Sequence, residues 1–135
     1  MKKFVALCLM TLMFFNVFGQ RIKIDTITNV SSEFSAQPKD GIQNFKKYIA
    51  KEFQISKEMN EKQLNGKIIC SFIVQRDGSF SDIEVLKDLG YGTAKGAIRI
   101  LQKYTSNFKW IPRIIGGRYV KEFIQIEIVL DLEDD

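Results

Sequence analysis

Residues 66–85 read GKIICSFIVQRDGSFSDIEV and carry the clearest structural pattern in the chain. A run of apolar residues is followed by Asp77-Gly78 and then by a second run in which apolar and charged residues alternate. Alternation with a period of two is typical of β-strands, and Asp-Gly is a typical hairpin turn. We therefore predict two antiparallel strands, over 67–75 and 79–87. The first is apolar on both faces, which indicates a central strand.

Helical periodicity lies on both sides of this hairpin. Apolar residues at spacings of three and four predict a helix over 41–54, with Asp40 as its N-cap. The same spacing predicts a second helix over 94–106, which Thr93 can cap. The second helix carries a basic stripe of Lys95, Arg99 and Lys103 on its polar face. We interpret this stripe as a solvated helix face, with a partner-binding patch as the alternative.

A long strand is expected near the end of the chain. Pro112 ends the helical geometry, and apolar residues then alternate over 119–130. The order helix, strand, strand, helix, strand predicts an α+β fold with two helices packed on one face of a three-stranded antiparallel sheet. The predicted sheet order is 2-1-3, which makes the last strand an edge. The free N–H and C=O groups of an edge strand can pair with another strand.

The N-terminus has the layout of a secretory signal peptide. Lys2 and Lys3 precede an apolar stretch over 4–18, and cleavage is expected after Gly19. The stretch is shorter than the roughly 20 apolar residues of a membrane-spanning helix. We therefore expect export to the periplasm, with an uncleaved inner-membrane anchor as the alternative.

The rest of the chain divides into three parts. We expect mostly linker over 20–39, in which Ile22, Ile24 and Ile27 could form a short strand. A single domain over 40–131 follows, and 132–135 form an acidic tail.

Composition excludes several classes of function. The 135 residues include no His, and the formal net charge is +4. Without His, the usual Ser-His-Asp and Cys-His nucleophiles and His-ligated metal sites are ruled out. An exported protein rarely meets nucleic acid, so we expect no nucleic-acid partner, and we also expect no enzymatic activity, cofactor or metal. Cys70 and Trp110 are interpreted as buried core residues.

Several short motifs, taken in order, resemble the C-terminal domain of TonB, especially the version common in Bacteroidetes-type bacteria. The resemblance covers about residues 40–130. Its parts are Gly66, Phe72-Ile73-Val74, Asp77-Gly78, Ile83-x-Val85, Gly90-Tyr91-Gly92 with Ala97, Trp110-x-Pro112 and Gly116-Gly117. The chain departs from a full TonB in having only a short spacer before the domain, with Pro38 as its only proline.

The resemblance implies a non-catalytic periplasmic module that docks a segment of a TonB-dependent outer-membrane transporter by adding a strand to its sheet. It places the docking edge in the last strand, with a set of expected partner-binding residues: Arg118, Lys121, Phe123, Gln125, Glu127 and Val129. The alternative is a secreted, stand-alone domain that binds another envelope protein without transducing energy. The exposed last strand could also pair with its own copy in a homodimer.

Overall fold

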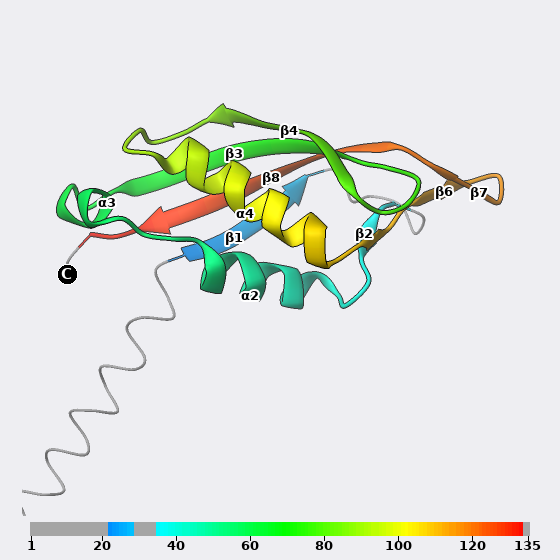
Figure 1. Ribbon diagram of the computed structural model, residues 1–135, viewed down its shortest axis with the longest axis horizontal. Coiled ribbons are helices and arrows are strands. Elements are labelled where there is room, and N and C mark those ends of the chain that lie inside the picture. The colour runs from blue at the N-terminus through cyan, green and yellow to red at the C-terminus, as the bar shows by residue number, and fades with distance from the viewer. Residues whose placement is uncertain (1–21, 29–34, 134–135) are drawn as a thin grey trace, which may run out of the picture.

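The computed structural model describes residues 22–28 and 35–133 (Figure 1). The expected signal peptide over 1–19 lies outside these residues, as do the last two residues of the acidic tail. The helices are α2 (Ile42–Glu52), α3 (Lys57–Glu61) and α4 (Thr93–Asn107). In the described part of the chain, no helix is long and apolar enough to cross a membrane.

The main sheet has four strands. In spatial order they are β1 (Ile22–Thr28), β8 (Glu122–Asp131), β3 (Asn65–Val74) and β4 (Phe80–Lys87), and all neighbours are antiparallel. Two small ladders join β2 (Gln37–Pro38) to β5 (Trp110–Ile111) and β6 (Arg113–Ile115) to β7 (Arg118–Val120). Helices α2 and α4 lie on the same face of the main sheet (Figure 1).

The predicted α+β fold class is confirmed. Strand β3 lies between β4 and β8, which is the predicted order 2-1-3, and the two long helices cover one face. Several local features were not predicted, among them the β2–β5 ladder and strand β6. The stretch 55–65, expected to be a loop, contains α3, and Lys121 separates the expected last strand into β7 and β8.

The prediction that the last strand is an edge is wrong. Residues 22–28, expected to be mostly linker, form β1, which pairs with β8 on the side away from β3. The backbone N–H and C=O groups of β8 that an edge strand would leave free therefore face another strand. The edges of the described sheet are β1 and β4.

The core forms where β3 and β8 face the helices. Ile68, Cys70 and Phe72 of β3 stand opposite Ile128, Ile126 and Ile124 of β8, and all six side chains are fully buried. Burying one such side chain stabilises a fold by about 1.5–3 kcal/mol. Because apolar residues alternate along both strands, one face of each strand is apolar and packs against the helices.

Trp110 is the centre of an aromatic cluster at one end of this core. Its side chain is 1% exposed, as expected for a core residue. Its ring lies edge-on to Phe45, Phe72 and Phe80, with centroid distances of 5.2, 5.6 and 5.3 Å. The edge-to-face geometry is favourable because the ring quadrupoles are complementary. The cluster joins α2, β3 and β4 to the segment that follows α4.

The β3–β4 turn packs against Trp110 through its glycine. The backbone N–H of Trp110 donates to the carbonyl of Gly78 over 3.0 Å. Gly78 has φ of +86°, and a Cβ there would lie 2.0 Å from the carbonyl oxygen of Trp110. Asp77 stabilises the turn by accepting hydrogen bonds from the hydroxyl and backbone N–H of Ser79, which lower the pKa of its carboxyl. Position 78 requires glycine, because its φ is positive and because a Cβ there would clash with Trp110.

Neither expected helix cap is present. The N-cap positions are Gly41 and Gly92, and neither helix has a side-chain cap hydrogen bond. The Thr93 hydroxyl instead accepts from the N–H of Leu89 and donates to the carbonyl of Gly90. Thr93 therefore fixes the turn that leads into α4.

We predict that Gly78→Ala lowers the free energy of unfolding by about 3 kcal/mol or more, because it adds backbone strain and a clash with Trp110. Gly90→Ala is the matched control, since Gly90 also has positive φ, +74°, but a Cβ added there would meet nothing within 4 Å. Urea unfolding monitored by tryptophan fluorescence measures both. Equal losses in the two variants would show that the Trp110 contact is unimportant.

We predict that Cys70 reacts with thiol reagents only after unfolding. Burial raises the pKa of its thiol from 9.0 to about 12. Since the folded pKa is the higher one, the associated stability is present below pH 9 and is lost as the pH rises from 9 toward 12. With Cys8, the other cysteine of the sequence, replaced by Ser, the free energy of unfolding in urea should fall by up to about 1.4 kcal/mol per pH unit more in the parent than in Cys70→Val. Identical pH profiles, or rapid labelling of the folded protein, would contradict burial.

Candidate functional site: the β8 side of the sheet

The two sides of the sheet differ in regularity. Strand β8 pairs with β3 over ten consecutive residues without a register shift. Strand β4 pairs with β3 through two register shifts, and Asp82, which lies within one of them, has φ of +51°. Bulges of this kind bend an edge strand and discourage further pairing. Of the two neighbours of β3, β8 is the regularly paired one, and its other neighbour in the described sheet is β1.

Four of the six expected partner-binding residues form a row along β8. Phe123, Gln125, Glu127 and Val129 alternate with the buried core residues and stand opposite Ile73, Ser71, Ile69 and Lys67 of β3. Phe123 is 52% exposed, and the other three are partly exposed. The row therefore lies on the sheet face opposite the one that contacts α2 and α4.

Glu127 already has a partner within the sheet. The Nζ atom of Lys67 lies 3.3 Å from its Oε2 atom. A partly exposed ion pair of this kind contributes at most about 1 kcal/mol to stability. The ion pair therefore contributes little to the stability of the sheet.

Arg118 and Lys121 lie apart from this row. Arg118 belongs to the β6–β7 hairpin, which extends beyond one end of the main sheet (Figure 1), and Lys121 directly precedes β8. Both are exposed, as are Ile115 and Tyr119 of the same hairpin. The hairpin thus presents cationic and apolar side chains together beside the start of β8.

Strand β1 occupies the remaining side of β8. Its register places Ile22 opposite Leu130, Ile24 opposite Ile128 and Ile27 opposite Ile126. The sequence signal for this strand was the spacing of these isoleucines. Its strict alternation is broken at Asp25, where the register shifts, so the stretch is a weak match to a strand pattern.

The chain between β1 and α2 is held by a buried carboxylate. Glu122, the first residue of β8, is 8% exposed and accepts a hydrogen bond of 2.6 Å from the backbone N–H of Ala36. Ala36 is itself buried. A buried backbone N–H without an acceptor would be costly, so this hydrogen bond stabilises the segment. Sequence reasoning missed this contact because the two residues are far apart in the chain.

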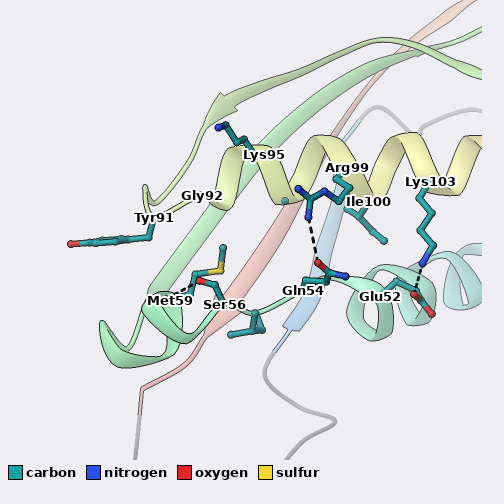
Figure 2. A pocket seen from close by; sticks show the side chains of 12 residues that line it. Glu52, Gln54, Ser56, Met59, Tyr91, Gly92, Lys95, Arg99, Ile100 and Lys103 are labelled. Carbon is teal, nitrogen blue, oxygen red and sulfur yellow. Dashed lines mark hydrogen bonds and ion pairs between the residues drawn. The ribbon is translucent and has the colours of Figure 1, made fainter.

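A groove lies on the helix side of the molecule, between α4, α3 and the segment that precedes α3 (Figure 2). Its volume is about 600 Å³. Lys103 Nζ lies 2.9 Å from Glu52 Oε2, and Arg99 Nη1 donates to Gln54 Oε1 over 3.4 Å. The contact with Lys103 lowers the pKa of Glu52 and raises that of Lys103. Two residues of the predicted basic stripe therefore link α4 to α2 and its following loop.

The described residues offer little for covalent or metal chemistry. Within 22–28 and 35–133, no three His, Cys, Asp or Glu residues are grouped closely enough to hold a metal ion. Cys70 is buried with a raised pKa, so its thiolate is disfavoured.

Comparison with known proteins identifies the fold. No family model and no curated protein match the chain. The solution structure of the Helicobacter pylori TonB C-terminal domain, residues 179–285, matches with a TM-score of 0.55 and 20% identity, over 80% of this chain and 89% of that one. The Pseudomonas aeruginosa TonB C-terminal domain aligns with a TM-score of 0.44 and 16% identity, over 82% and 99%. The chain thus has the fold of a TonB C-terminal domain.

We predict that Glu122→Ala lowers the free energy of unfolding by about 1–3 kcal/mol, because the N–H of Ala36 loses its buried acceptor. Glu122→Gln keeps an acceptor and should lose less. Glu84→Ala, at an exposed position of β4, serves as the control and should change stability little. Hydrogen exchange at Ala36 should accelerate in Glu122→Ala alone. Unchanged exchange there would contradict the assigned contact.

Proposed function

We propose that this chain is a non-catalytic, TonB-like interaction module of the periplasm. It docks an extended segment of a TonB-dependent outer-membrane transporter by strand addition beside β8, and so takes part in TonB-dependent transport. The fold supports the class of module. The observation that carries the docking site is that β8, already paired along its length with β3, accepts a second antiparallel strand on its other side.

Strand addition suits the chemistry of this side. Backbone hydrogen bonds supply affinity, and alternate side chains supply selectivity. The outer row of Phe123, Gln125, Glu127 and Val129 offers such alternate positions, while Arg118 and Lys121 favour a segment with acidic residues at its end. The sheet of the bound complex would retain the same helices and core.

A second candidate is a stand-alone envelope binding domain with no energy-transducing role. The position of β1 favours it, because this strand begins three residues after the expected cleavage point at Gly19 and lies against the domain. Even with β1 released, a linker of about 19 residues would span at most about 65 Å. An anchored domain with so short a spacer would have limited reach across the periplasm.

We predict that synthetic transporter segments bind the full chain and change hydrogen exchange in β8 and in β1, the strand that pairs with it. Arg118→Glu with Lys121→Glu should weaken binding of acid-ended segments by about 5- to 20-fold, because two favourable charges become repulsive. Lys47→Glu, on the exposed face of α2, is the matched control and should leave affinity unchanged. Titration calorimetry at two salt concentrations measures the effect. Exchange changes confined to β4 or to the helices would refute docking at β8.

Cell fractionation separates the two candidates. A mature chain that begins at Gln20 in the soluble periplasmic fraction supports the stand-alone domain. A full-length, membrane-bound chain supports a module attached to an energy-transducing complex.

A further inference from the structure

Strand β1 has the position that a docked segment would take. It is antiparallel to β8 and pairs with residues from Leu130 to Gln125 of that strand. It continues through residues 29–34 to a segment that Glu122 holds at Ala36. Strand β1 and strand β8, with which it pairs, therefore belong to the same chain, and Glu122 of β8 also holds that chain at Ala36.

The register of β1 specifies what this side of β8 accepts. Residues directly opposite one another in an antiparallel pair lie on the same face of the sheet. Ile126, Ile128 and Leu130 are fully buried, so a segment in this register needs apolar residues opposite each of them. The sequence of β1, IKIDTIT, carries isoleucine at all three positions and polar residues at the others.

Pairing of β1 is less complete than pairing of β3. Six residues of β1 have Cα partners in β8, and the register shifts between Ile24 and Thr26. All ten residues of β3 have partners in β8 without a shift. A bulge interrupts the ladder and leaves a residue unpaired. An external segment with uninterrupted alternation could form a more complete ladder in the same place.

We propose that β1 is an internal occupant of the docking side of β8, which a partner segment must displace. The partner segment is an extended peptide of about seven residues with β-branched apolar residues in register with Ile126, Ile128 and Leu130 and polar residues between them. This inference rests on the proposed function, and it adds both a competitor and a sequence pattern. Because the competitor is tethered, it is always present. Only chains in which β1 is released can bind a partner, so the apparent affinity for every partner is the intrinsic affinity multiplied by the released fraction.

The other edges are less suited to the same partner. Strand β4 is interrupted by two register shifts, so a regular segment cannot follow it along its length. The remaining possibility is that a partner segment adds to the outer side of β1. Release of β1 would then weaken binding, whereas displacement of β1 predicts that release strengthens binding. The two arrangements are therefore separable by experiment.

A release variant and a matched control test the occupant. Ile24→Ser with Ile27→Ser removes the apolar residues opposite Ile128 and Ile126. Thr26→Ser with Thr28→Ser introduces the same residue at the polar register positions of the same strand. The probe is a fluorescent peptide of residues 21–30, RIKIDTITNV, and its affinity for each full-length protein is measured by anisotropy. The emission of buried Trp110 reports that each variant is folded.

A disulfide lock that holds β1 against β8 tests the opposite case, in which β1 cannot be released. Lys23→Cys with Val129→Cys, in a Cys8→Ser background, places the two thiols at paired positions of β1 and β8. Cys70 is buried and does not compete for the new thiols. Oxidation should hold β1 in place, and a reductant should free it. Binding of the peptide should be lost on oxidation and restored on reduction.

The expected result is that the peptide binds the release variant at least about tenfold more tightly than it binds the parent or the Thr26→Ser, Thr28→Ser control. Equal affinity for parent, release variant and oxidised lock would overturn the proposal. Tighter binding to the parent than to the release variant would place the site on the outer side of β1 and would also overturn it.

The transporter segments used above separate failure of this inference from failure of the proposed function. If the 21–30 peptide follows the expected order but no transporter segment binds any variant, β1 is the occupant and the proposed transporter partner is wrong. If transporter segments bind parent, release variant and oxidised lock equally, docking stands and displacement of β1 is wrong.

Discussion

The unbroken ladder between β3 and β8 is the constraint on which the rest of the structure depends. Because ten residues pair without a shift, the apolar side chains on one face of each strand all point at the helices. A slip by one residue would turn all of them to the opposite face. The same ladder fixes which residues of β8 form the outer row, and β1 pairs with the other side of β8. Core and candidate docking side therefore have a single origin.

The aromatic cluster holds the ends of the remaining elements to this ladder. Trp110 contacts rings from α2, β3 and β4, and its backbone hydrogen-bonds to the turn at Gly78. The segment after α4 thus returns to the sheet at a fixed point before the chain enters the β6–β7 hairpin and β8. Glu122 then fixes the N-terminal segment to the start of β8. The start of β8 is therefore held by the segment that follows α4 and by the N-terminal segment at Ala36.

Local pattern was sufficient to predict most of this fold. The hairpin at Asp77-Gly78, the alternation in β3 and β8 and the spacing in both long helices each have a strong short-range signal. Helix α3 has only five residues, too few to show a period. The helix caps were misassigned because Gly41 and Gly92 take these positions through backbone conformation, which a preference for polar caps does not reveal. Strand β1 was undervalued because Asp25 interrupts its alternation.

The candidate site was only partly predictable. Alternation placed Phe123, Gln125, Glu127 and Val129 on one face, and the structure gathers them in one row. The neighbour of β8 on its other side could not be derived, since it depends on a pairing between segments about 100 residues apart. The contact between Glu122 and Ala36 is equally remote in sequence. Such long-range contacts are set by the assembled fold, which local pattern does not encode.

The nature of the two edge strands affects whether copies of the protein can pair with one another. A regular ten-residue strand such as β8, left open, is a template on which copies of the protein could stack edge to edge into fibrillar aggregates. Here β1 covers that strand, and the opposite boundary is kinked by the irregularities of β4. The two edge strands, β1 and β4, both contain register shifts, which discourage edge-to-edge polymerisation. The strand with the most regular pairing is therefore kept away from the edges of the described sheet.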